Sequence, residues 1–329
     1  MAQKRRVAGW MLLAGLAMVG RGAEQVDGVT VLLVVGAEGE AEYRTQFAAQ
    51  VPLWEKVAAQ AGAKKVVVGT NAAVDATTDL ERLKQALAAE PKTGGELWVV
   101  LIGHGTYDGK DAKFNLRGPD LTATELATWL KPFNRPLAVI NTASASAPFI
   151  SKLGGANRVV ITATRTGNEH NFARLGPYLA EAMGDPKSDL DQDGQTSLLE
   201  AFLSASARVK EFYKTEGRLA TEHALIDDNG DGLGTPAEWF RGTRATKKAK
   251  DGAALDGTRA RQFHLVRSEA EARLTTEQRA RRDELERAVE ALRESKAKLG
   301  EAEYYGKLEA LMVELAQLYG TVGGAAGTK

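Results

Sequence analysis

The chain contains no cysteine, and this absence excludes several kinds of chemistry at once. Without a thiol there can be no disulfide, no cysteine nucleophile, no zinc–thiolate or iron–sulfur site and no lipid attached through cysteine. The loops must therefore be held by a hydrophobic core or by a bound metal that uses other ligands.

Net charge is also lacking. The chain has 43 Lys and Arg residues against 43 Asp and Glu residues, and a sequence pI of about 6.9. No overall field attracts nucleic acid or anionic lipid, so we predict no nucleic-acid partner. Hydrophobic residues make up 43% and charged residues 26%, which is typical of a folded globular protein.

The chain has no apolar run long enough to span a bilayer. Lys4, Arg5 and Arg6 precede the uncharged run Val7–Gly20, which is shorter than the ~20 residues that a spanning helix needs. Small residues follow, before Ala23. This is the three-part pattern of a secretory signal. A short membrane anchor and a buried N-terminal helix are the alternatives. We predict that residues 1–22 are a signal peptide and that the mature protein is exported to the periplasm or the extracellular space, without stable insertion in the membrane.

Short apolar runs alternate with helical patterns between Val29 and Ala182. The runs are continuous rather than alternating, as expected for strands covered by helices on both faces. They are Val29–Val35, Lys65–Val68, Leu97–Ile102, Leu137–Ile140 and Arg158–Thr162. The helical patterns between them are Tyr43–Ala61, Asp79–Ala89, Thr122–Leu130 and Phe172–Met183. Thr122 with Glu125 forms a capping box. The order predicts an α/β fold with a mainly parallel sheet.

Two twelve-residue acidic segments, 189–200 and 227–238, carry the spacing of EF-hand-type calcium loops. Calcium takes six to eight oxygen ligands, and such loops supply them from positions 1, 3, 5, 7, 9 and 12, with glycine at position 6. The first loop places Asp189, Asp191, Asp193, Gln195, Ser197 and Glu200 there, and the second Asp227, Asn229, Asp231, Leu233, Thr235 and Glu238. Gly194 and Gly232 stand at position 6. Asp-Gly clusters also form simple turns. Two complete copies favour bound Ca2+.

Other features of these loops indicate structural sites rather than a calcium sensor. Position 8, where an aliphatic residue usually pairs two loops, is Thr196 in one loop and Gly234 in the other. Pro186 ends the preceding helix early. Both loops are assigned to a domain that covers residues 23–240.

The C-terminal part has a different character. Residues 241–267 are rich in Arg, Lys, Gly and Ala and are interpreted as a linker. In residues 268–329, Leu285, Leu292 and Leu299 recur every seven residues, and apolar residues continue out of phase after Gly300. We predict a helical hairpin or an interrupted coiled coil, which could support self-association. A helix lying on the sheet domain is the alternative.

A histidine follows the third predicted strand. Leu97–Ile102 runs into Gly103-His104-Gly105, and the next strand ends in a hydroxyl-rich loop, Asn141–Phe149. Ligands bind at the carboxyl ends of strands in parallel α/β sheets. A histidine between two glycines at that edge is well placed to act on a ligand.

These segments resemble the legumain and caspase clan of cysteine peptidases, and most closely its exported bacterial legumain-like members. The matching features are the strand ending in His-Gly, a second strand ending in Ala-Cys-x-Ser-Gly-x-Phe, and a third ending in Thr-Ala. Here the second becomes Ala143–Phe149 and the third includes Thr162-Ala163. The resemblance covers roughly residues 29–240 and implies a caspase-like sheet flanked by helices.

The resemblance implies roles for three residues. His104 would be the catalytic histidine, the Gly105 and Ser144 N–H groups would form the oxyanion hole, and Ser144 stands where the clan has its nucleophilic cysteine. A serine needs a base within hydrogen-bonding reach to take its proton. Two hypotheses follow: a non-catalytic (pseudopeptidase) module that binds a peptide or protein in the cleft at the sheet edge, or an endopeptidase that uses a Ser144/His104 dyad. An unrelated α/β fold in which His104 is structural is the third alternative.

Overall fold

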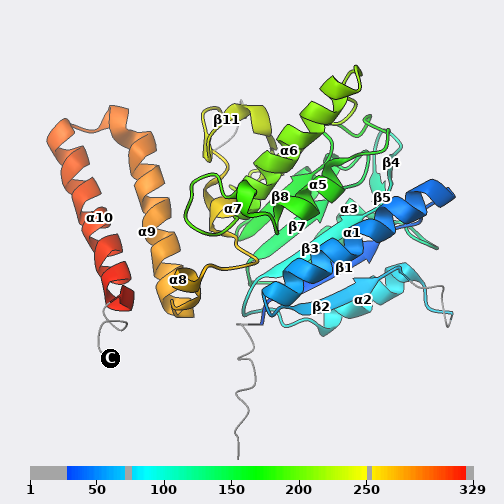
Figure 1. The fold of residues 1–329 in the computed structure, drawn as a ribbon, viewed down its shortest axis with the longest axis horizontal. Helices are drawn as coiled ribbons and strands as arrows, with labels where there is room; N and C mark the ends of the chain where they lie inside the picture. Colours follow the sequence, from blue (N-terminus) through cyan, green and yellow to red (C-terminus); the bar gives the residue numbers. More distant parts are fainter. Residues whose placement is uncertain (1–27, 71–75, 250–253, 324–329) are drawn as a thin grey trace, which may run out of the picture.

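The central element is a mainly parallel sheet. The computed structural model describes residues 28–70, 76–249 and 254–323. The predicted signal peptide, residues 1–22, lies outside them. Within the described residues the sheet order is β2-β1-β3-β7-β8-β9-β10. Figure 1 labels the strands of this order from β2 to β8. The strands are β1 (Thr30–Val35), β2 (Lys64–Val68), β3 (Leu97–Ile102), β7 (Leu137–Asn141), β8 (Arg158–Thr162), β9 (Leu225–Asp227) and β10 (Thr235–Pro236). The first five pair in parallel, and β9 and β10 are antiparallel to their neighbours.

Helices cover both faces of this sheet, which explains the continuous apolar strands. Alternate residues of β1 enter opposite cores: Leu33 packs with Trp54 of α1, whereas Leu32 packs with Leu83 of α2. The first core joins α1 (Ala41–Gln60), α5 (Leu175–Ala182) and α6 (Leu198–Thr215), and the second joins α2 (Asp79–Ala89), α3 (Ala123–Leu130) and α4 (Pro148–Leu153). The predicted α/β fold class, a mainly parallel sheet flanked by helices, is confirmed.

The two edges of the sheet differ from its centre. At one edge, the β2 residues Lys64 and Lys65 are exposed. At the other, β10 consists of only two residues, Thr235 and Pro236, which pair with Ile226 and Leu225 of β9. The sheet thus ends in a charged strand on one side and in a proline on the other.

A small antiparallel sheet follows β3 directly. It comprises β4 (Gly105–Tyr107), β5 (Ala112–Phe114) and β6 (Leu121–Thr122). The predicted capping box at the next helix is present, since the Thr122 side chain accepts from the Glu125 N–H and the Glu125 carboxylate accepts from the Thr122 N–H.

The segment interpreted as a linker differs from that expectation. It contains part of β11 (Phe240–Arg241), all of β12 (Arg244–Ala245) and α7 (Thr258–Gln262). Phe263 and Leu265 are each only 4% exposed, and the Phe263 ring meets the Trp98 indole with ring centroids 5.8 Å apart. Large apolar residues are few in this segment, but the core takes these two, so residues 254–267 belong to the folded domain.

The C-terminal residues form a helical hairpin. The short helix α8 (Glu269–Ala272) leads into α9 (Thr276–Ser295), and α10 (Glu301–Gly323) returns beside it (Figure 1). Leu285, Val289 and Leu292 are buried on α9. The Gln262 side chain of α7 donates to Glu286 of α9 at 2.9 Å, which ties the hairpin to the sheet domain. Among the described residues, no helix has the length and hydropathy of a membrane span.

Candidate functional site

The carboxyl ends of β3 and β7 bring the predicted catalytic residues to one edge of the sheet. The two strands are adjacent and parallel, with Leu101 opposite Asn141. His104 and Gly105 follow β3, and Ser144 follows β7. The sequence therefore placed these three residues correctly relative to the sheet.

The Ser144 hydroxyl is occupied by the backbone of Gly105. The Gly105 N–H donates to Ser144 Oγ at 3.2 Å, and Ser144 Oγ donates to the Gly105 carbonyl at 3.1 Å. Ser144 is 3% exposed. A side chain at position 105 would collide with the Ser144 carbonyl oxygen, so only glycine permits this close approach. The hydroxyl acts here as a bridge between two strand ends.

His104 is held by aromatic rings. Its imidazole lies 4.5 Å from the Tyr43 ring, 5.0 Å from the Phe47 ring and 6.1 Å from the Phe172 ring, measured between ring centroids. Burial lowers the pKa of His104 below its ordinary value, although a hydrogen bond to the Glu38 backbone opposes this shift. No hydrogen bond joins His104 to Ser144 in the described part of the chain.

The hydrogen bonds of Ser144 also affect the predicted oxyanion hole. One of its two donors, the Gly105 N–H, already binds Ser144 Oγ. Ala145, which follows Ser144 in the chain, has φ of 53°, in the left-handed region that non-glycine residues seldom adopt. Its N–H donates to the Glu169 carbonyl at 2.8 Å. Strained backbone of this kind persists only where surrounding contacts impose it.

Glu169 organises this loop and was not identified from the sequence. Its carboxylate accepts from the Arg165 N–H at 2.8 Å and lies 2.6 Å from Nδ1 of His223. His223 is 54 positions away in the chain. Because no local pattern links residues so far apart, only the folded structure reveals the contact.

The first acidic loop gathers its aspartates. One oxygen atom from each of Asp189, Asp191 and Asp193 lies within 4.8 Å of the others, the only such cluster within residues 28–70, 76–249 and 254–323. Burial, and then the charges of Glu200, Asp193 and Asp189, raises the pKa of Asp191 to about 6. Gln192 and Gly194 both have positive φ, which gives the sharp turn expected at position 6. Such a group of hard oxygen donors fits a calcium ion.

Glu200, at position 12 of this loop, is turned toward the backbone. Its carboxylate accepts from the N–H groups of Leu190 and Asp191 at 2.7 and 3.1 Å, and from the Ser197 N–H at 2.8 Å. The Ser197 and Glu200 pair forms a capping box that starts α6. Ser197 and Glu200 therefore have a structural role at the helix start, in addition to their predicted place in the calcium loop.

The second loop repeats the turn but not the cluster. Asp227 accepts from the Gly230 and Gly232 N–H groups at 2.9 and 3.0 Å, and both glycines have positive φ, as at positions 4 and 6 of the first loop. Thr235 then enters β10, so Glu238 lies exposed in the following 3-10 turn, Ala237–Trp239. Within the described residues, Asp227, Asp231 and Glu238 do not form a cluster like that of the first loop.

Asp256 supports the second loop from the segment interpreted as a linker. Its carboxylate accepts from the Asp228 and Asn229 N–H groups at 2.9 and 3.2 Å, and from the Thr235 hydroxyl at 2.5 Å. Burial, and then the charge of Asp228, raises the pKa of Asp256 to about 8. This carboxyl was missed because the sequence pattern covers only residues 227–238.

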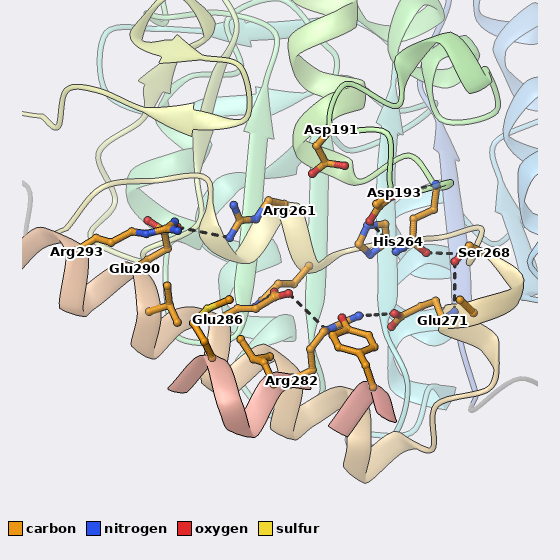
Figure 2. Close-up of a pocket in the computed structure, with 17 residues that line it drawn as sticks. Asp191, Asp193, Arg261, His264, Ser268, Glu271, Arg282, Glu286, Glu290 and Arg293 are labelled. Carbon is orange, nitrogen blue, oxygen red and sulfur yellow. Dashed lines mark hydrogen bonds and ion pairs between the residues drawn. The ribbon is translucent and has the colours of Figure 1, made fainter. Parts of the chain in front are cut away.

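A cavity of about 470 Å³ lies between the first loop, α7 and the helical hairpin. Figure 2 shows Asp191 and Asp193 on one wall, with Arg261 and Arg282 on others. Arg282 is already paired with Glu271 and Asp283. The Ser268 N–H donates to Gln195 at 3.0 Å, so the first loop directly contacts the start of the hairpin segment.

Comparison with known proteins gives similarity of structure only. No protein-family model and no curated protein matches the chain. The Drosophila initiator caspase Dronc is similar over 63% of this chain and 81% of its own, with 14% identity and a TM-score of 0.41. Caspase-1 from Spodoptera frugiperda is similar over 61% and 86%, with 10% identity and a TM-score of 0.39. Both of these solved structures are caspases. At TM-scores under 0.5 the likeness decides neither the fold family nor the activity of this chain.

Proposed function

We propose that this chain is a non-catalytic, calcium-binding module on a caspase-like fold. The observation that supports this most is the pair of hydrogen bonds between Ser144 and the Gly105 backbone. A serine nucleophile needs a base within reach, but this hydroxyl donates to a carbonyl and the His104 ring is held elsewhere by aromatic side chains. The proposed ligand is a peptide or protein segment, which binds without cleavage at the carboxyl ends of β3 and β7.

The alternative endopeptidase would need several rearrangements together. Ser144 would have to leave both partners on Gly105, reach His104, and release the Gly105 N–H for the oxyanion. The two hydrogen bonds between Ser144 and Gly105 thus engage both the nucleophilic hydroxyl and one of the oxyanion donors. A cysteine at this position would not need the histidine as a base in the same way, since the thiolate itself is the nucleophile.

The test is a peptide library incubated with the purified full chain in calcium, beside Ser144→Ala and Ser144→Cys variants. We expect no cleavage by the natural chain or by the alanine variant. Cleavage by the natural chain that disappears in the alanine variant would overturn the proposal. Cleavage by the cysteine variant alone would mean that the site retains the geometry but lacks the nucleophile.

Calcium binding is proposed for the first loop, on the support of its clustered aspartates. A ligand that binds only the folded state, and is present at a concentration of 100 times its Kd, stabilises that state by about 2.7 kcal/mol. Chelation should therefore lower the melting temperature, and Asp191→Asn should remove this response. Glu238→Gln is the matched control, because that carboxylate lies outside the cluster, and it should melt like the natural chain. A response that survives Asp191→Asn, or its loss in Glu238→Gln, would contradict this assignment.

Export is proposed from the pattern in residues 1–22 alone. Outside the cell, calcium is abundant enough to fill loops of the millimolar class. Mass spectrometry of the secreted chain should find an N-terminus near residue 23, and retention of the intact N-terminus in the cell would contradict export.

A further inference from the structure

The exposed apolar side chains of this protein are unevenly distributed. Among the described residues, the exposed large hydrophobic side chains are Leu190, Leu219, Leu233, Tyr305, Met312, Val313 and Tyr319. Four of these lie on α10, and Leu190 and Leu219 line one groove beside α6. All of them except Leu233 therefore lie either in this groove or on α10, where Met312 and Tyr319 also line the cavity between the first loop, α7 and the hairpin.

The groove beside α6, called the α6 groove below, measures about 770 Å³. Its walls come from the first acidic loop, α6, the segment that follows α6, and β11. Leu203 and Phe240 contribute apolar surface, and Leu219 on the wall is 90% exposed. The Ser206 hydroxyl is buried in the lining, with no hydrogen-bond partner among the described residues. Pockets of this size and composition commonly hold a ligand or a partner side chain.

The rim of the α6 groove is basic. Lys210, Lys214 and Arg218 line it, and Glu238 is the exposed acid there. Lys214 is paired with Glu211 at 3.3 Å, whereas Lys210 and Arg218 have no ion pair within the described part of the chain. The groove is therefore suited to an apolar segment that carries carboxylates.

The exposed face of α10 has the complementary character. Tyr305, Met312 and Val313 are 50%, 49% and 48% exposed. Glu309 lies within one helical turn of each of them and has no ion pair within the described residues. Between Glu301 and Gly323 the helix has four Glu and one Lys, so its net charge is 1 − 4 = −3.

We propose that the exposed face of α10 docks in the α6 groove of a second copy of this chain. Its own groove is out of reach, because α10 packs on α9 and α9 is tied to α7 by Gln262. Figure 1 shows α10 at the outer edge of the molecule, with α9 between it and the sheet domain. The contact joins two different surfaces, and such heterologous contacts build rings or open chains.

A symmetric pair of α10 helices is the less favourable arrangement. It would bring the Glu309 carboxylates of both copies into one apolar contact, where neither has a basic partner. In the α6 groove, Lys210 and Arg218 meet the same carboxylate and screen it. The charges therefore select the groove over a helix pair.

Sedimentation velocity on the full chain with calcium tests this proposal. The average mass should rise with concentration, and it should rise less at high salt, because exposed charges are screened. Leu219→Asp disables the groove and Val313→Asp disables the helix face, so each variant alone should be monomeric. Both positions are exposed, and circular dichroism should confirm folding. Ala48→Asp, at an exposed apolar residue of α1 outside both surfaces, is the matched control and should associate normally.

Mixing the two defective variants gives the decisive result. The Val313→Asp chain keeps its groove and the Leu219→Asp chain keeps its helix face, so an equal mixture should form one-to-one dimers that grow no further. A mixture that stays monomeric would overturn the proposal. So would natural-strength association of the Leu219→Asp chain alone, which would indicate symmetric helix pairing, or a natural chain that stays monomeric at every concentration.

Discussion

The Ser144 hydroxyl can be tested by its contribution to stability, independently of any activity. Each neutral hydrogen bond contributes about 0.5–1.5 kcal/mol net, and a buried partner left unsatisfied costs about 1–3 kcal/mol. Ser144→Ala removes the bonds of 3.2 and 3.1 Å to Gly105. Because the site is buried, water cannot replace the hydroxyl, and we expect a loss of about 1–3 kcal/mol in the free energy of unfolding.

Ser206→Ala provides a matched control with the opposite sign. The Ser206 hydroxyl is also buried inside the helix α6, but it has no hydrogen-bond partner in the part of the chain that the structure describes. Its removal breaks no bond and relieves an unsatisfied polar atom. Alanine also favours helix over serine by a few tenths of a kcal/mol. We therefore expect equal or greater stability, higher by up to about 1 kcal/mol.

Urea unfolding in saturating calcium, followed by tryptophan fluorescence, measures both changes. The dependence on urea should be the same in all three proteins, so that the midpoint reports the free energy. Stability of Ser144→Ala equal to that of the natural chain would refute the reasoning, because a hydroxyl that can be removed without loss is not held by Gly105. It would then be free to act as a nucleophile.

Three further predictions test other parts of the structure. Phe263→Ala should cost about 3–5 kcal/mol in urea unfolding, because the ring is buried against Trp98, whereas a linker residue would cost little. Burial, and then the Arg282 charge, lowers the pKa of His264 from 6.5 to about 3. As pH falls below 6.5 the unfolded chain therefore gains a proton that the folded chain does not, and stability falls. Relative to His264→Gln, the natural chain should lose about 2 kcal/mol between pH 7.5 and pH 5, measured by urea unfolding at each pH. Gly105→Ala should lower the free energy of unfolding by about 1–3 kcal/mol, and with it the urea midpoint, because the added methyl group collides with backbone atoms. Gly300→Ala should leave the midpoint unchanged, because its methyl group enters open space.

The sequence was informative wherever the local structure depends on residues that are close together in the chain. The apolar runs located the strands, and the position-6 glycines Gly194 and Gly232 have the positive φ that the spacing predicts. The capping box at Thr122 could also be predicted, because its two partners are three residues apart. In each case the physical cause lies within one turn of the chain.

Contacts between distant segments could not be predicted in this way. The ligand spacing placed Glu238 at position 12, but the spacing does not register that Thr235 pairs with Ile226 of β9 and removes the next residues from the loop. Asp256 supports the loop from 28 residues beyond Asp228. Likewise, the hydrogen bonds of Ser144 depend on how closely the ends of β3 and β7 approach, which no motif specifies.

The two outer strands of the central sheet, β2 and β10, restrict how this protein can associate. An open sheet edge invites strand addition from another chain, and charged side chains or proline prevent it. Lys64 and Lys65 place charges along the β2 edge. At the opposite edge Pro236 has no N–H to donate, and the strand is only two residues long. The lysine charges on one outer strand and the proline on the other therefore oppose the addition of a further strand, and crowded copies of the folded chain should resist fibril growth through this sheet.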